Sequence, residues 1–270
     1  MDIELKSKLE YTGERMVPEG VDNNTFWEHI YRYRFATKYI HGKDVLDIAS
    51  GEGYGTAALT QGGSKSVIGV EIDLKSVEHS REKYNIDVRQ GDATKIPLVD
   101  NSVDVVISFE TVEHIVDTSA FISECARVLR PGGMIVISTP NVAEYNVNSD
   151  PMNNPYHCSE MTEQQFANLL ESKFNRATIF HQYPVSAPRW SISSLRLPAS
   201  VWRSTRLVWR LRSLSQHRHP DTTVLARANP VNEILRSESF LSRLTNPYVV
   251  RSPARNVPVM YLIAVAYVKK

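Results

Sequence analysis

Two carboxylates and an imidazole follow an apolar run in the middle of the chain. Residues 103–109 read VDVVISF, and Glu110, Glu113 and His114 come soon after them. If the apolar run is a buried strand, these groups lie where the strand ends and a turn of helix begins. An imidazole, with an ordinary pKa of about 6.5, can take a proton from a hydroxyl group near neutral pH. General-base chemistry by His114 is therefore one interpretation of the pattern.

The same groups could instead hold a metal ion. On a helix, positions i, i+3 and i+4 lie on one face, so Glu110, Glu113 and His114 can converge. His157, in the segment NNPYH after a later strand, would supply a fourth ligand. Mixed oxygen and nitrogen ligands suit Mg²⁺ or Mn²⁺, and Zn²⁺ and Fe²⁺ also accept them.

A purely structural role is a third interpretation of this stretch. Glu110 would then contact a bound cofactor or a backbone amide, Glu113 would be solvated, and His114 would pack or cap. The choice among the three depends on the elements that position these side chains.

Short apolar segments rich in valine and isoleucine alternate with helical segments from residue 44 onward. Nearly continuous apolar character is typical of strands that are covered on both faces. We expect strands at residues 44–49, 66–72, 87–92, 103–109, 134–140, 176–184 and 257–270. We expect helices at residues 74–84, 118–129 and 162–173, with N-caps at Asp73, Asp117 and Thr162. Repeated βαβ units of this kind predict an α/β fold with a doubly wound, mainly parallel sheet.

A glycine-rich turn follows the first of these strands. Residues 45–56 read VLDIASGEGYGT, and Gly51 and Gly53 allow a close backbone approach to a ligand. Such a turn commonly holds a nucleotide-like group. Glu71 ends the next strand, where an acid can accept hydrogen bonds from ribose hydroxyls. Asp92 ends the third strand and could accept a hydrogen bond from an exocyclic amine.

A dinucleotide such as NAD is the first candidate ligand for this turn. Thr56 stands where the third glycine of the dinucleotide fingerprint would be, and Asp47 inside the strand would repel a diphosphate. A sulfonium ion with an amino-acid tail tolerates nearby acids better. Electrostatics therefore favours S-adenosylmethionine.

Residues 44–140 resemble the class I S-adenosylmethionine-dependent methyltransferases. The usual D-x-G-x-G-x-G motif is present as DIASGEG, with Ala49 in place of the first glycine, and LRPGG precedes the fifth strand. The resemblance implies a Rossmann-like sheet of seven strands, mainly parallel, whose antiparallel last strand would be residues 257–270. It also implies a set of cofactor-binding residues: Tyr33, Asp47, Ala49, Gly51, Gly53, Tyr54, Glu71, Ile72, Asp92, Ala93 and Phe109.

The segment TGERMVPEG…FWEHIYRYRFA resembles the N-terminal part of bacterial methyltransferases of glycan and polysaccharide pathways. In such enzymes a helix that precedes the sheet often closes over the cofactor. By helical spacing, Trp27, His29, Arg32 and Tyr33 share or flank one face. Packing of Trp27 and Tyr33 on the sheet is the alternative interpretation.

A second resemblance concerns the two acids and the histidine. F-x-x-x-E-H after the fourth strand, S-T-P-N after the fifth and a later histidine look like the small-RNA 3′-terminal 2′-O-methyltransferases, and the E-H pair is similar to that of ubiquinone-pathway O-methyltransferases. This implies that Glu110, Glu113, His114 and His157 bind a metal that grips a vicinal diol and lowers the pKa of the attacked hydroxyl. Related enzymes with an E-H pair use no metal, so catalysis by His114 alone stays open.

The segment from 185 to 256 contains twelve arginines, no lysine and three acidic residues. We expect it to be an α-rich insertion between the sixth and seventh strands, including a helix at residues 199–212. It could be a solvated basic face that packs or forms a homodimer, or a lid that grips an anionic acceptor through arginine–phosphate contacts. A third interpretation is contact with an anionic membrane surface through its arginines and tryptophans. Nucleic acid is a weaker candidate, because the sequence has no recognised RNA-binding motif.

Composition and segment boundaries complete the prediction. The chain has 270 residues, a net charge of +1, two cysteines and no apolar run long enough to span a bilayer. With no disulfide framework and no signal-like N-terminus, these features favour the cytoplasm, with peripheral membrane contact if the insertion docks there. We divide the chain into a cap segment (1–40), a cofactor-binding core (41–184), the arginine-rich insertion (185–256) and the last core strand (257–270).

The predicted function is methyl transfer from S-adenosylmethionine to a hydroxyl of a sugar, in a glycan or a glycosylated metabolite, with or without a divalent cation. Methylation of an RNA 2′-hydroxyl is an alternative within enzymes. An alternative of another class is a scaffold protein that binds the cofactor and uses the insertion as its interface.

Overall fold

The computed structural model describes residues 16–17, 23–143, 156–184, 249–250 and 259–269. The predicted helix at 199–212, almost all of the predicted insertion and half of the predicted cap segment (residues 1–15 and 18–22) lie outside these ranges.

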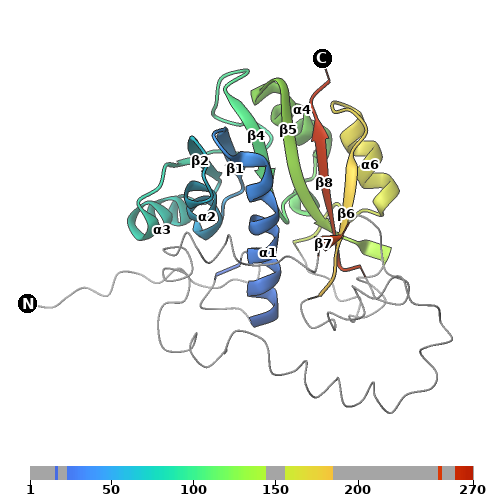
Figure 1. Cartoon of the computed structure of the whole chain (residues 1–270), viewed down its shortest axis with the longest axis horizontal. Helices are drawn as coiled ribbons and strands as arrows, with labels where there is room; N and C mark the ends of the chain where they lie inside the picture. The colour runs from blue at the N-terminus through green and yellow to red at the C-terminus, as the bar shows by residue number, and fades with distance from the viewer. Residues whose placement is uncertain (1–15, 18–22, 144–155, 185–248, 251–258, 270) are drawn as a thin grey trace, which may run out of the picture.

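An eight-stranded sheet forms the centre of the described part of the chain (Figure 1), in the order β3-β2-β1-β4-β5-β8-β6-β7. Strands β1 to β5 are parallel, whereas β8 is antiparallel to both β5 and β6. The predicted mainly parallel sheet with an antiparallel last strand is therefore confirmed, and the two-residue β7 is added to it. The strands are β1 (Asp44–Ile48), β2 (Ser66–Glu71), β3 (Val88–Gln90), β4 (Val103–Ser108), β5 (Leu129–Pro140), β6 (Thr178–Gln182), β7 (Val249–Val250) and β8 (Tyr261–Tyr267).

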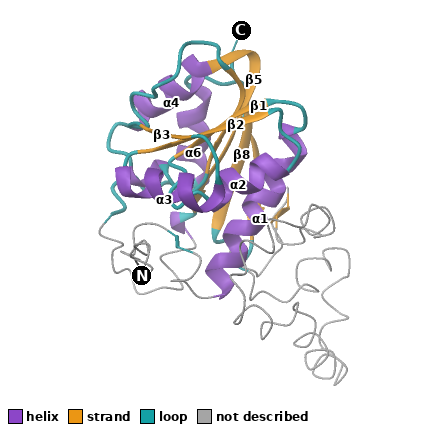
Figure 2. Ribbon diagram, turned by 90° about the vertical axis from the view of Figure 1, so that its left-hand side faces the viewer, coloured by secondary structure: helices purple, strands orange, loops and turns teal. Residues whose placement is uncertain are grey.

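Helices cover both faces of the sheet. The helix α1 (Asn23–Ile40) contacts α2 (Tyr54–Gln61), which contacts α3 (Leu74–Tyr84), and α4 (Thr118–Val128) contacts α6 (Glu163–Glu171). Figure 1 shows α1 in front of the sheet and α4 behind it, and Figure 2 shows the twisted sheet from the side. Strand order reverses between β1 and β4, so right-handed crossovers place the earlier and later helices on opposite faces.

Local sequence signals fix the starts of three helices. The side chain of Asp73 caps α3, that of Asp117 caps α4, and Thr162 forms a capping box with Gln165 at the start of α6. Each side chain accepts hydrogen bonds from backbone N–H groups that have no partner within the helix. The predicted N-caps are confirmed.

Two elements differ from their predicted form. Strand β5 begins at Leu129 rather than at residue 134, because Leu129 pairs with Val103 before the register shifts between Val103 and Val105. After β4, the expected turn of α-helix is a short 3₁₀ turn, η1 (Val112–His114). The second difference changes which side chains can meet in the site.

The helix α1 packs into the hydrophobic core and does more than cover one face of the sheet. Ile30 and Phe35 are buried in the core, and Trp27 and Tyr33 are buried too. Among the described residues, no helix is long and apolar enough to cross a bilayer.

Candidate functional site

A cavity of about 400 Å³ lies at the carboxyl ends of the strands, where the strand order reverses between β1 and β4. Ligands bind to open α/β sheets at this kind of position. Most of the predicted site residues line it, and Asp47 and Gly53 do not. Those in the wall are Tyr33, Ala49, Gly51, Tyr54, Glu71, Ile72, Asp92, Ala93, Phe109, Glu110, Glu113, His114 and His157.

The glycine-rich turn joins β1 to α2 in an unusual backbone conformation. Gly51, Gly53 and Ala49 have φ angles of 57°, 97° and 56°. Ala49 thus adopts the left-handed conformation that a glycine in the motif would reach more easily, so its departure from the motif leaves the shape of the turn in place. A Cβ atom on Gly53 would lie 2.4 Å from Ser80 Cβ in α3, which explains why the turn has a glycine at this position.

Glu52, inside the turn, is fully buried and was not predicted to matter. Its carboxylate contacts three side chains of α3: Tyr84 Oη donates a hydrogen bond to Oε2 at 2.7 Å, His79 Nε2 lies 3.0 Å from Oε1, and Lys83 forms an ion pair with it. These contacts tie the turn to the helix behind it. The signal available in the sequence was an acid between the two glycines.

Replacing Glu52 with glutamine is expected to lower the free energy of unfolding by about 2 kcal/mol, because a buried ion pair and charge-assisted hydrogen bonds are lost. The affinity for the cofactor should fall with it, since the turn loses its anchor. Urea unfolding and calorimetric titration with S-adenosylmethionine measure the two effects. Glu78→Gln, at an exposed position of α3, the helix that Glu52 contacts, is the matched control and should change neither quantity.

Asp47 lies behind the cavity wall and supports it. Oδ2 accepts a hydrogen bond from Thr56 Oγ1 at 2.6 Å, and Oδ1 accepts one from Tyr33 Oη at 3.3 Å. Burial, with a smaller contribution from Glu71, raises the pKa of Asp47 to about 7. Thr56, at the third position of the fingerprint, therefore uses its side chain to hold this acid, where a glycine could not.

The ends of β2 and β3 provide the polar groups predicted for a nucleoside. Glu71 Oε2 accepts a hydrogen bond from Gly51 N at 2.8 Å, which joins the end of β2 to the glycine-rich turn after β1. Asp92 is exposed, and its Oδ1 accepts from the backbone and hydroxyl of Thr94, both at 2.7 Å. Ile72 is 65% exposed beside them and offers an apolar surface to a base. Ribose hydroxyls and a purine ring fit this combination.

Glu113, His114 and His157 come together at η1. Ligand atoms of the three side chains lie within 4.8 Å of one another, and the two imidazole rings are 4.9 Å apart. The backbone holds His157 in place, because the N–H groups of Cys158 and Ser159 donate to Glu113 O at 2.8 and 3.0 Å. The structure thus joins two segments that are more than forty residues apart in the sequence.

The surroundings of this cluster orient its side chains. His114 Nδ1 lies 3.0 Å from Tyr156 O, and His157 Nδ1 lies 3.0 Å from Glu160 Oε1. Glu113 is fully buried, and its Oε1 has no hydrogen-bond partner within the described part of the chain. Burial raises the pKa of Glu113 well above its ordinary value, and the nearby charge of Glu110 adds to the shift. A buried carboxylate of this kind requires a proton or a cation.

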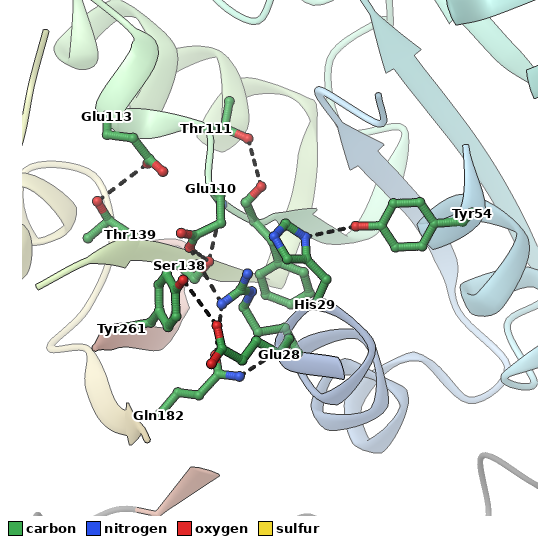
Figure 3. A network of polar contacts seen from close by, with 12 residues as sticks. Glu28, His29, Tyr54, Glu110, Thr111, Glu113, Ser138, Thr139, Gln182 and Tyr261 are labelled. Atoms are coloured by element: carbon green, nitrogen blue, oxygen red, sulfur yellow. Dashed lines mark hydrogen bonds and ion pairs between the residues drawn. The ribbon is translucent and has the colours of Figure 1, made fainter. Parts of the chain in front are cut away.

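Glu110 does not join the cluster. Its backbone has a φ angle of 53°, and it precedes the 3₁₀ turn, so the helical face expected for Glu110, Glu113 and His114 is not formed. Its Oε1 accepts a hydrogen bond from Ser138 Oγ at 2.6 Å and lies 4.0 Å from Arg32 Nη1. Figure 3 shows Glu110 directed toward Ser138, and Glu113 toward Thr139. Of the four residues predicted to bind a metal, Glu113, His114 and His157 therefore come together and Glu110 does not.

The helix α1 contributes residues that were not assigned to the site. His29 lines the cavity, and its Nδ1 lies 2.8 Å from Tyr54 Oη. Arg32 is fully buried, donates to Gln182 Oε1 at 2.9 Å and stacks over the ring of Tyr261. The spacing of His29 and Arg32 placed both near one helical face, whereas Tyr261 gave no signal in the sequence.

Comparisons with known proteins agree with this geometry. A family model described as a methyltransferase domain matches residues 46–137. The chain is 40% identical over 174 residues to a "Probable S-adenosylmethionine-dependent methyltransferase" of Mycolicibacterium smegmatis, covering 63% of this chain and 67% of that protein. It is 31% identical over 177 residues to a ubiquinone biosynthesis O-methyltransferase of Bradyrhizobium sp., covering 57% and 68%.

A solved structure supports the fold alone. A SAM-dependent methyltransferase from Thermotoga maritima matches with a TM-score of 0.55 at 16% identity, covering 90% of this chain and 93% of that one. The chain spans about two thirds or less of the length of the curated relatives that it matches.

Proposed function

Because the chain belongs to the S-adenosylmethionine-dependent methyltransferases, we propose that it methylates a hydroxyl group of a sugar, in a glycan or a glycosylated metabolite. The observation that carries the proposal is the Glu113–His114–His157 cluster, which shares one cavity with the residues assigned to the cofactor. The O-methyltransferase relatives favour oxygen as the acceptor atom. The resemblance of the N-terminal segment to glycan-pathway enzymes favours a sugar.

A neutral hydroxyl is a poor nucleophile, so the site must help to remove its proton. The acceptor oxygen attacks the methyl carbon, the carbon–sulfur bond breaks in line with it, and S-adenosylhomocysteine leaves. A base or a cation beside the acceptor oxygen lowers the barrier of this step. The cluster at η1 supplies groups of both kinds.

The cluster fits a divalent cation. Among the described residues, Oε1 of buried Glu113 has no hydrogen-bond partner, so a cation could take the place of its proton. The Nδ1 contacts of both histidines orient their rings, as hydrogen bonds to metal-binding histidines do. One carboxylate and two imidazoles suit Mn²⁺, Fe²⁺ or Zn²⁺ better than Mg²⁺, which prefers oxygen ligands. A bound cation would polarise the acceptor hydroxyl.

The arginine-rich segment 185–256, outside the described residues apart from β7, is the proposed contact for an anionic acceptor. Its alternatives are a membrane surface and a second copy of the chain. A nucleotide-linked sugar should then be a better acceptor than the same sugar as a neutral methyl glycoside.

Methyl transfer from labelled S-adenosylmethionine to a panel of acceptors tests the function. The panel holds UDP-glucose, GDP-mannose, dTDP-rhamnose, their methyl glycosides and a short RNA with a free 3′-terminal diol. We expect transfer to a sugar, a loss of at least about tenfold with EDTA or in Glu113→Gln, and recovery from EDTA on adding Mn²⁺ or Zn²⁺. Glu163→Gln is the matched control, since this acid also contacts a histidine, His181, but lies outside the cavity.

Each other outcome contradicts a defined part of the proposal. Full activity both in EDTA and in Glu113→Gln would exclude the proposed role of the cation. Transfer to the RNA alone would show that the acceptor is a ribose 2′-hydroxyl of RNA and not a sugar of a glycan or glycosylated metabolite. Binding of S-adenosylmethionine without transfer to any acceptor would favour the scaffold alternative.

A further inference from the structure

His29 is an imidazole that reaches the cavity from α1, a different element from the one that carries His114 and His157. It is half-buried and lines the cavity, and its Nδ1 lies 2.8 Å from Tyr54 Oη (Figure 3). The ring of Tyr54 packs edge-on against Tyr33, which packs in the same way against Phe109. His29 is thereby held against the aromatic side chains that line this part of the cavity.

The charges around His29 favour its neutral form. Burial lowers the pKa of His29 well below its ordinary value, and the Arg32 cation, one turn further along α1, lowers it again. Tyr54, from α2, is in direct contact with His29, and burial raises the pKa of its hydroxyl well above the ordinary value. The Arg32 cation opposes this shift of Tyr54, and the charges of Asp47 and Glu110 add to it. A neutral imidazole carries a lone pair that can accept a proton.

The other two histidines are placed for a different task. His114 and His157 lie with the buried Glu113 carboxylate in one group of converging ligand atoms. A ring nitrogen that donates its lone pair to a cation cannot take a proton at the same time. When a cation occupies that group, proton removal needs a base outside it, and His29 is an imidazole in the wall of the same cavity.

We propose that His29 is the general base that takes the proton of the acceptor hydroxyl, a role that rests on the proposed O-methylation. As the acceptor oxygen bonds to the methyl carbon, the carbon–sulfur electron pair goes to sulfur, and the hydroxyl proton goes to His29 Nε2. This requires the tautomer in which Nδ1 carries the proton of the neutral ring and donates a hydrogen bond to Tyr54 Oη, so that the lone pair is on Nε2. The hydrogen bond to Tyr54 is thus what directs the basic nitrogen.

The variant His29→Asn tests the role by turnover. Asparagine retains a donor that can reach Tyr54 but has no nitrogen at the Nε2 position. With the best acceptor of the panel above, kcat should fall about 100-fold or more, while the affinity for S-adenosylmethionine stays unchanged. The acidic limb of the kcat–pH profile should disappear with it. His41→Asn, at an exposed position away from the cavity, is the matched control and should leave kcat unaltered.

A measurement without turnover tests the same proposal. ¹⁵N NMR of the imidazole in the complex with S-adenosylhomocysteine should show His29 neutral at pH 7, with the proton on Nδ1. An imidazolium ion, or a proton on Nε2, would overturn the proposal, whatever the acceptor is. A His29→Asn enzyme with the kcat of the wild type would also overturn it, and would leave O-methylation standing. Absence of transfer by the wild-type protein would instead count against the proposed function.

Discussion

Replacing Gly53 with alanine is expected to lower the free energy of unfolding by about 3 kcal/mol or more. Two costs add at this position. Its φ angle of 97° is unfavourable for any residue with a Cβ atom, and that atom would lie 2.4 Å from Ser80 Cβ and 3.3 Å from Ser80 Cα. Either the turn or α3 must move, so S-adenosylmethionine affinity should fall as well. Urea unfolding and calorimetric titration measure the two losses.

Two glycines with similar backbone angles separate strain from crowding. Gly51 and Gly132 have φ angles of 57° and 80°, and a Cβ atom on either would meet nothing within 4 Å. Alanine at each should cost only about 1 kcal/mol. Gly51→Ala should nevertheless weaken cofactor binding, because Gly51 is in the cavity wall and Gly132 is not. Equal losses of stability in all three variants would contradict the steric explanation.

The second large effect concerns Asp47 and pH. Its folded-state pKa of about 7 is above its ordinary value of 3.8, so the folded protein binds this proton more tightly than the unfolded chain does. The contribution of Asp47 to the free energy of unfolding therefore falls as pH rises between these two values and is lowest above pH 7. The shift corresponds to about 4 kcal/mol. Asp47→Asn resembles the protonated acid, so it should match the wild type near pH 4 and be more stable by up to about 4 kcal/mol at pH 8.

Urea unfolding of both cofactor-free proteins from pH 4 to pH 8 measures the difference in their free energies of unfolding. Groups that titrate alike in the wild type and in Asp47→Asn cancel in this difference. Asp44→Asn is the contrasting control. Hydrogen bonds from Ser66, Lys65 and Arg130 lower the pKa of Asp44 to about 2, so its contribution is constant over this range and is lost only at lower pH. A difference for Asp47→Asn that does not change with pH would show that its carboxyl is ionised throughout.

The parts of the fold that could be predicted depend on local signals. Apolar segments such as residues 103–109 identified the strands, and the side chains of Asp73, Asp117 and Thr162 identified three helix starts. The site at the strand ends followed from geometry, because parallel strands bring their carboxyl ends to one edge of a sheet.

The errors in the site come from contacts between distant residues. Glu110 was assigned to a helical face, but Ser138, on the neighbouring strand, binds its side chain, and its positive φ angle carries it away from Glu113. The assignment of Asp47 to the cofactor stays a prediction, and the motif did not reveal that Thr56 and Tyr33 donate hydrogen bonds to its carboxylate. The spacing of residues within one strand or helix does not reveal these contacts, since each contact depends on how separate elements pack.

The position of β8 has a consequence for synthesis of the protein. Strand β8 pairs along its length with β5 and also with β6, so β6 reaches the rest of the sheet only through it. During translation, β1 to β5 leave the ribosome long before residue 261 does, and they can assemble first. Tyr261, in the cavity wall, comes with β8. A nascent chain can therefore form the part of the cavity wall at the ends of β1 to β4 early, but the wall is complete only when β8 has added Tyr261.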